Sequence, residues 1–242
     1  MKHKSLLAFA LTFIITTSLG NTLPLPDSLT ALNSTTGQHT LIDSHYKRDY
    51  WPLSQYFVTE HGLTYCAPAS IAMVLNSMNI EPPLTPEHAP YAMFTQNNLF
   101  NSHAIVDIIT PTKIKHQGLT LDQAATILKA FNLKVTTVHA DEANIKNFTD
   151  ELKTALKKKH SFVIVNFSRK GIKQKGGGHF SPIAAYNDTT QQALILDVAR
   201  YKYPPAWVDT ETLLGAMQTT DSTSELSRGY LIITKKNTMN DV

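Results

Sequence analysis

The strongest constraint on the fold is a helical pattern that begins at the only cysteine of the 242-residue chain. Four apolar side chains recur at positions i, i+3, i+4 and i+7, the spacing of one helix face: Ile71, Val74, Leu75 and Met78. Pro68 fits only the first turn of such a helix, where its missing N–H group has no partner to lose. The pattern therefore places Cys66 at the N-terminus of a helix.

A helix start suits a reactive sulfur. Unpaired backbone N–H groups and the positive end of the helix dipole favour a thiolate over a thiol there. The same N–H groups can stabilise an oxyanion on a substrate carbonyl. A single cysteine cannot form an internal disulfide, so Cys66 is either an inert buried residue or a free thiol kept for chemistry. Its position at the start of a helix favours the second alternative, a free and reactive thiol.

The first twenty residues have the composition of an export signal. A basic start, Met1 to Lys4, precedes an apolar stretch from Leu6 to Leu19 that is short for a membrane span. We predict a signal peptide at residues 1–20, with cleavage after Gly20, and an exported protein, periplasmic or secreted, without stable membrane insertion after cleavage. The alternative is an uncleaved N-terminal anchor.

The rest of the chain predicts an α+β fold. Residues 21–44 are expected to form an extended arm with one strand at 40–42, residues 45–236 one catalytic domain, and residues 237–242 a tail. Aromatic residues from Tyr50 to Phe57 are expected to pack in the core. Thr120 and Gln123 form a capping-box pattern, and residues 144–159 an amphipathic helix that buries Ile145 among others. Helices precede a largely antiparallel sheet whose predicted strands cover 133–138, 162–167 and 230–234.

Two further strand-like runs, 180–186 and 193–198, are joined by a polar turn and predict a β-hairpin. His179 opens the first strand, directly after three glycines, and Asp197 lies near the end of the second. These two ends of an antiparallel hairpin lie close together, so the imidazole and the carboxylate can meet. A cysteine at a helix start with such a pair is the arrangement of a cysteine hydrolase, in which histidine moves the proton and aspartate orients its ring.

Other functional classes receive less support. The net charge is only +3 and no basic stripe with interleaved aromatics occurs, which argues against nucleic-acid binding. His61 lies close to Cys66 in sequence but lacks an acidic partner at useful spacing. The remaining histidines show no ligand-like spacing, so we expect no metal site and no tightly bound cofactor.

Three separated segments carry a resemblance to a known family. They are residues 64–76, which include TYCAPAS and MVLN, residues 177–182 (GGHFSP) and residues 197–205 (DVARYKYPP). Their residues and order resemble the phytochelatin synthases, and the resemblance covers about residues 45–236. It implies a papain-like fold and a glutathione γ-glutamylcysteinyltransferase. The implied roles are nucleophile for Cys66, general base and acid for His179, and orienting residue for Asp197.

The resemblance also implies a reaction and its contacts. The cysteine attacks the Cys-Gly bond of glutathione, releases glycine and transfers γ-Glu-Cys from a thioester to water or to a second glutathione. Arg228 and Asp221 are implied partners of the γ-glutamyl group, which suits a zwitterion because it needs one cation and one anion. The remaining implied substrate contacts are Asn166, Gly178 and Arg200.

The chain departs from the family pattern at two positions. Family members usually carry glutamine six residues before the nucleophile, as an oxyanion donor, and this chain has Glu60. An ionised carboxylate cannot donate a hydrogen bond and repels an oxyanion. Either Glu60 is protonated, or it contacts another substrate group, or catalysis is slower. Ala67 replaces the usual glycine after the nucleophile.

Plant members add a cysteine-rich C-terminal region, which this chain lacks, so we expect a short bacterial-type member. Hydrolysis of glutathione or a single transfer is then expected rather than polymerisation. Cadmium or zinc could activate the reaction through the glutathione thiolate, and a homodimer is left open. The alternatives are a papain-like peptidase or amidase acting on another exported γ-glutamyl or peptide substrate, and a non-catalytic thiol or metal binder.

Overall fold

The computed structural model describes residues 22–86, 88–101, 105 and 109–236. The predicted signal peptide and the predicted tail lie outside these described residues. Among the described helices, none combines the length and the apolar character that crossing a membrane requires.

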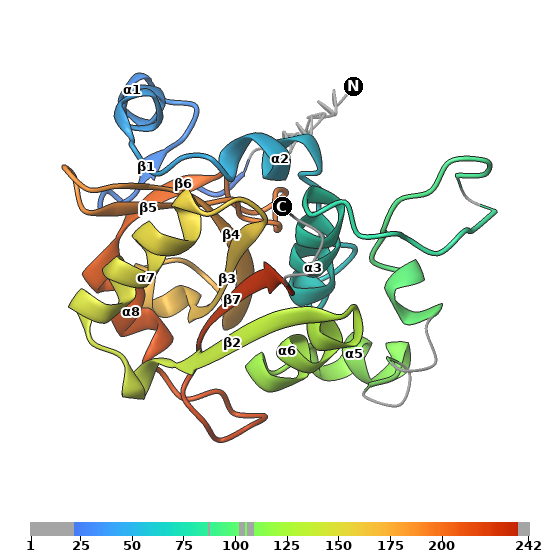
Figure 1. The fold of residues 1–242 in the computed structure, drawn as a ribbon. Coiled ribbons are helices and arrows are strands. Elements are labelled where there is room, and N and C mark those ends of the chain that lie inside the picture. The colour runs from blue at the N-terminus through green and yellow to red at the C-terminus, as the bar shows by residue number, and fades with distance from the viewer. Residues whose placement is uncertain (1–21, 87, 102–104, 106–108, 237–242) are drawn as a thin grey trace, which may run out of the picture.

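Within the described residues, seven strands form one sheet in the order β1-β6-β5-β4-β3-β7-β2 (Figure 1). All neighbouring strands are antiparallel. The strands are β1 (Thr30–Ala31), β2 (Leu133–His139), β3 (Ser161–Ser168), β4 (Gly178–Asn187), β5 (Gln192–Ile195), β6 (Ala206–Asp209) and β7 (Gly229–Lys235). The predicted hairpin is the β4–β5 pair, and the predicted antiparallel sheet of an α+β fold is confirmed.

Helices cover both faces of this sheet. The α-helices are α1 (Thr35–Asp43), α2 (Tyr50–Gln55), α3 (Cys66–Ser77), α5 (Pro111–Gln117), α6 (Leu121–Ala130), α7 (Ile145–Lys157) and α8 (Thr210–Met217). Short 3-10 helices are η1 (Asn98–Asn101), η2 (Ala140–Glu142) and η3 (Arg169–Ile172). Helices α3 and α6 contribute to one hydrophobic core and α7 and α8 to a second, with the sheet between them (Figure 1).

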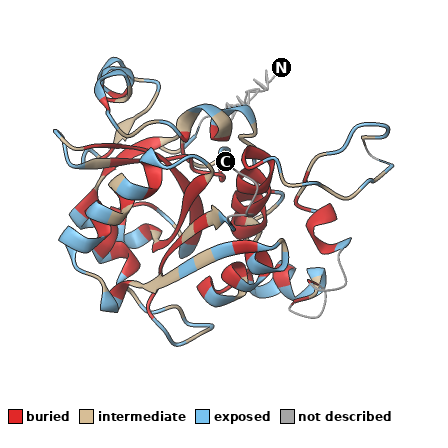
Figure 2. Ribbon diagram, viewed as in Figure 1, coloured by how far each residue is buried: buried red, intermediate tan, exposed pale blue. Residues whose placement is uncertain are grey.

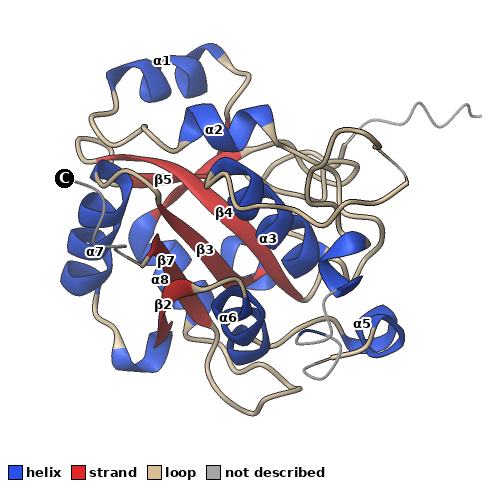
Figure 3. Cartoon of the chain, turned by 45° about the vertical axis from the view of Figure 1, so that its right-hand side comes forward, coloured by secondary structure: helices blue, strands red, loops and turns tan. Residues whose placement is uncertain are grey.

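Helix α3 begins at the cysteine, as predicted, and lies at the centre of the first core. All of its residues from Cys66 to Ser77 are buried (Figure 2). The helix packs against β4, which it crosses in Figure 3. A helix that is apolar on all sides is stable only when surrounded. This burial fixes the first turn of α3 against the strand that begins at Gly178.

The segment predicted as an extended arm has regular structure instead. Residues 40–42 belong to α1, so the strand predicted there is wrong. Ser34 caps this helix by accepting a hydrogen bond from the Gly37 N–H at 3.0 Å, and such a cap favours a helix over the strand preference of Thr40 and Ile42. Strand β1 pairs with β6, and the indole of Trp207 donates to the Gly37 carbonyl at 3.0 Å. The arm is therefore part of the sheet and its packing.

Two burial predictions are also wrong. Trp51 is 63% exposed because α2 turns it towards solvent, although its neighbour Tyr50 packs against the core. Ile145 is 37% exposed in the first turn of α7, and the residues of the following turns form the buried face of this helix.

The capping box at the start of α6 is confirmed, since Thr120 and Gln123 exchange hydrogen bonds between side chain and backbone at 3.2 and 2.9 Å.

Candidate active site

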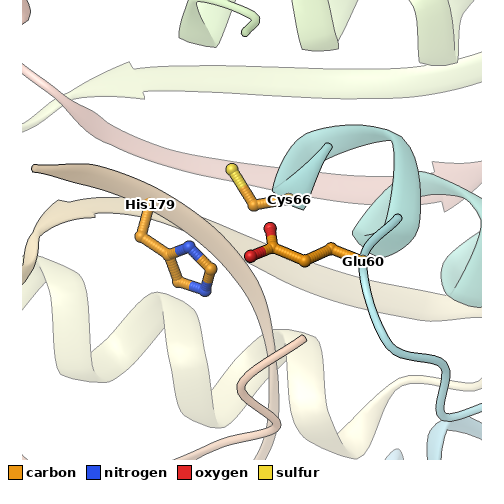
Figure 4. A group of neighbouring side chains, drawn as sticks. All are labelled: Glu60, Cys66 and His179. Atoms are coloured by element: carbon orange, nitrogen blue, oxygen red, sulfur yellow. The ribbon is translucent and has the colours of Figure 1, made fainter. Parts of the chain in front are cut away.

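Three buried side chains from distant parts of the chain meet at the start of α3. Cys66 is the first residue of this helix, Glu60 lies in the preceding loop, and His179 is the second residue of β4. Their sulfur, carboxylate and imidazole atoms all lie within 4.8 Å of one another. Figure 4 shows the three side chains pointing towards a common space.

Asp197 lies two residues beyond the end of β5 at Ile195, so the second predicted strand, 193–198, is shorter than expected, but Asp197 still meets His179 of β4. Nε2 of His179 donates to Oδ1 of Asp197 at 2.8 Å, and the Ala199 N–H donates to the same oxygen at 2.9 Å. Ser181, two residues further along β4, places its hydroxyl 3.1 Å from Nε2. The neighbouring Cys66 side chain contributes to raising the pKa of His179. Because Nε2 is engaged with Asp197, Nδ1 is the nitrogen available to the sulfur.

Arg169 also belongs to this cluster, although the sequence patterns did not identify it as a site residue. Its two terminal nitrogens each donate to one oxygen of Asp197 at 2.8 Å, and both side chains are buried. Gly176 has φ 131°, and a Cβ there would lie 2.9 Å from Cδ of Arg169. The glycine run thus provides space for the arginine. A buried carboxylate needs a cation, and that requirement was the available signal for a basic residue near the hairpin.

The charges fix the protonation of the pair. Burial by itself raises the pKa of Asp197, but His179 and Arg169 outweigh it and hold that pKa well below its usual range. Burial likewise opposes the charged imidazole, yet the Asp197 carboxylate outweighs it and raises the pKa of His179 to about 9. His179 is therefore an imidazolium at neutral pH, the form that pairs with a thiolate and can protonate a leaving amine.

Glu60 is held in place from several sides. Its backbone N–H donates to the Val198 carbonyl at 2.9 Å. Gln96 bonds the residues on either side, accepting from the His61 N–H at 2.8 Å and donating to the Thr59 carbonyl at 2.9 Å. Neither Gln96 nor Tyr201 was identified from the sequence, because both lie far from Glu60 along the chain.

The two oxygens of the Glu60 carboxyl group have different environments. Oε1 accepts a hydrogen bond from the hydroxyl of Tyr201 at 2.6 Å. Burial, and then Glu60 itself, raise the pKa of Tyr201, so its hydroxyl remains a donor. Oε2 is buried and has no hydrogen-bond partner within the described residues. This oxygen can therefore accept a further hydrogen bond or bind a cation.

A second polar group contains Arg228, Asp221 and Gly178 of the residues expected to contact substrate, and Asn166 lies on the neighbouring strand. Nη2 of Arg228 lies 3.8 Å from Asp221, and its Nη1 donates to the carbonyl and hydroxyl oxygens of Thr219 at 3.2 and 3.1 Å. A Cβ on Gly178 would lie 3.0 Å from Nε of Arg228. Asn166 is opposite Gly229, the residue after Arg228, in the sheet register.

This second group contains unpaired polar atoms. Nε of Arg228 and both amide atoms of Asn166 are buried without a hydrogen-bond partner in the described structure. Such atoms carry a desolvation cost of about 1–3 kcal/mol each unless a bound group satisfies them. They are candidate contacts for a polar ligand.

Two residues discussed from the sequence lie outside both groups. Arg200 is exposed, its guanidinium lies 4.7 Å from the ring centre of Phe57, and it makes a long bond of 3.5 Å to the Phe57 carbonyl. The expectation that it contacts substrate gains no support from this position. His61 is also exposed, and its ring lies against Tyr65 rather than the cysteine.

Comparison with known proteins gives a consistent result. A family model described as phytochelatin synthase matches residues 20–230. Glutathione γ-glutamylcysteinyltransferase 3 of Lotus japonicus is 35% identical over 187 residues, which are 77% of this chain and 37% of that protein. The corresponding protein of Schizosaccharomyces pombe is 26% identical over 212 residues, which are 86% of this chain and 50% of that protein. The chain thus spans between about a third and a half of the length of these relatives.

Among solved structures, the peptidase domain of Streptococcus ComA, a bifunctional ABC transporter of a quorum-sensing pathway, is similar with a TM-score of 0.42 and 16% identity. The similarity covers 74% of this chain and 97% of that domain.

Proposed function

The chain belongs to the phytochelatin synthase family, and we propose that it is an acyl-transfer enzyme that acts on glutathione through Cys66. The observation that carries the proposal is the buried Cys66–His179–Asp197 arrangement, with an imidazolium next to the sulfur and a carboxylate 2.8 Å from the far nitrogen. The named activity of the relatives supplies the substrate class.

The proposed chemistry has two halves. The Cys66 thiolate attacks the carbonyl carbon of the Cys-Gly bond, and the first-turn N–H groups of α3 stabilise the oxyanion. His179 protonates the departing glycine amine, which leaves γ-Glu-Cys as a thioester. Neutral His179 then takes a proton from water or from the amine of a second glutathione. The products are glycine with either γ-Glu-Cys or a γ-Glu-Cys-extended glutathione, and the sulfur is restored.

The γ-glutamyl end of glutathione carries one ammonium and one carboxylate. Arg228 offers a cation with an unpaired Nε, Asp221 an anion 3.8 Å away, and Asn166 an unpaired amide. A zwitterion could therefore be bound by opposite charges and could satisfy the buried polar atoms. We propose this group as the site of the γ-glutamyl end.

Product analysis tests the proposal directly. Purified protein incubated with glutathione should release one glycine for each γ-Glu-Cys unit transferred, with and without added cadmium. Because the chain has one cysteine, iodoacetamide modifies a single thiol, and the alkylated protein is the matched control. Cleavage of other γ-glutamyl or peptide substrates without glycine release from glutathione would instead indicate a peptidase or amidase.

Replacing Glu60 with glutamine should keep or raise the rate of acylation. The amide can donate a hydrogen bond to an oxyanion, which an ionised carboxylate cannot. Single-turnover release of glycine measures this step. A loss of more than about tenfold, or about 1.4 kcal/mol, would mean that the carboxylate has a role of its own.

Replacing Gly178 with alanine should raise the KM for glutathione by up to about tenfold, or about 1.4 kcal/mol. The new Cβ would lie 3.0 Å from Nε and Nη2 of Arg228, so the guanidinium must move. Gly177→Ala is the matched control, since a Cβ there meets nothing within 4 Å. Steady-state kinetics on both variants should leave Gly177→Ala within about twofold of the parent. Equal KM values in the two variants would remove Arg228 from the substrate site.

A further inference from the structure

We propose that Glu60, Cys66 and His179 bind a zinc ion, which reversibly blocks the catalytic sulfur. The three side chains offer one sulfur, one nitrogen and one oxygen donor, all buried and within 4.8 Å of one another. Spacing along the sequence did not indicate this group, because its members are 6 and 113 residues apart. The proposal concerns the protein without substrate and does not depend on the glutathione reaction.

The donor set is one that zinc accepts. Zinc binds cysteine sulfur at about 2.3 Å and histidine nitrogen or carboxylate oxygen at about 2.0–2.2 Å, often with three protein ligands and one open position. Tetrahedral ligands at these distances lie about 3.5 Å apart. The three ligand atoms lie up to 4.8 Å apart, so they must approach one another by about 1 Å to bind one zinc ion. Rotation of the side chains can provide this movement.

The surrounding contacts already orient two of the ligands. His179 donates from Nε2 to Asp197 at 2.8 Å, which leaves Nδ1 for a metal, and zinc-binding histidines commonly donate their other nitrogen to a carboxylate. Tyr201 holds Oε1 of Glu60 at 2.6 Å. These partners fix the direction of the imidazole and the carboxylate.

The unpaired oxygen of Glu60 is the independent sign of a ligand. Glu60 is 5% exposed, and its Oε2 has no hydrogen-bond partner within the described residues. The carboxylate points into the space shared with Cys66 and His179 (Figure 4). A buried carboxylate oxygen without a partner is unfavourable, and a divalent cation removes that cost.

The proposed zinc site depends on Glu60, which stands where family members usually carry glutamine. A glutamine at the same place would present a neutral amide, which is a poorer zinc ligand than a carboxylate. Binding needs a deprotonated cysteine and a neutral histidine, so the proton held by the pair is released to solvent. Zinc and an acyl substrate would then compete for the same sulfur atom.

Zinc binding is measured without glutathione, by competition with a chromophoric chelator and by the rate at which iodoacetamide alkylates Cys66. The parent protein should bind one zinc, and zinc should slow alkylation at least tenfold. Glu60→Gln, Cys66→Ser and His179→Ala should each weaken binding at least tenfold. His61→Ala, next to Glu60 but outside the group, should bind within twofold of the parent.

Circular dichroism would establish that each variant is folded. Glu60→Gln is nearly isosteric, and alkylation of the parent needs no variant at all. The proposal is overturned if zinc leaves the alkylation rate of the parent unchanged. It is equally overturned if Glu60→Gln binds zinc as tightly as the parent, or if binding survives in Cys66→Ser. Absence of zinc binding by the parent protein, together with normal glycine release from glutathione, would reject this site and leave the proposed reaction intact.

Discussion

Replacing Cys66 with alanine should lower the rate of glycine release from glutathione by at least about 10⁴-fold. A nucleophile that acts as part of a unit contributes most of the chemical acceleration, and binding with oxyanion stabilisation leaves only a small residual rate. No other cysteine in the chain could replace it. Glycine assay and intact-mass detection of the thioester would both report the loss.

The same variant should remain folded. Alanine is a strong helix former, and the change removes a single sulfur from the first turn of α3. Urea unfolding should therefore show a modest loss in the free energy of unfolding, about 1 kcal/mol. Glycine release at the parental rate by folded Cys66→Ala protein would show that the reaction does not pass through this sulfur.

Replacing Asp197 with asparagine should lower the rate of glycine release by about 10³–10⁴-fold. The amide cannot hold His179 in the same tautomer or stabilise its imidazolium, the loss seen when an orienting aspartate is replaced in a catalytic triad. The change also leaves Arg169 buried without its anion. Breaking a buried ion pair in this way costs about 3–5 kcal/mol of folding free energy.

Asp188→Asn is the matched control for this change. Asp188 pairs with His45 at 3.3 Å on the surface, where the side chain of His45 is 77% exposed. Exposed pairs contribute about 0–1 kcal/mol, so this variant should keep both its stability and its glycine release. If Asp197→Asn protein lost stability but kept kcat at a temperature where it is folded, Asp197 would be structural only.

Local patterns were sufficient for the elements that carry Cys66 and His179. The helical spacing from Ile71 to Met78 and the first-turn Pro68 predicted where α3 begins. Two strands separated by a polar turn predicted the hairpin, and hairpin geometry predicted that His179 and Asp197 are close. Each inference depends on neighbours in sequence, where backbone geometry leaves few alternatives.

The residues that hold Glu60 and Asp197 in place could not be predicted from local patterns. Tyr201 and Gln96 reach Glu60 from segments 141 and 36 residues away, and only the tertiary fold brings them together. Arg169 follows β3 directly and reaches Asp197, 28 residues further along the chain, only in the folded structure. The strand predicted at 40–42 failed for the opposite reason, since its β-branched residues matched a local pattern that the Ser34 cap overrides.

The two-residue strand β1 has a consequence for how the molecule behaves at high concentration. It pairs with β6 and ends the sheet on that side. A sheet edge with many unpaired backbone groups is a template for intermolecular strand addition, and proteins limit it with very short terminal strands. Gly37 helps to keep this edge closed, because its missing Cβ allows α1 to approach Ala31 closely. We therefore expect the N-terminal segment to protect the protein from strand addition at its β6 edge.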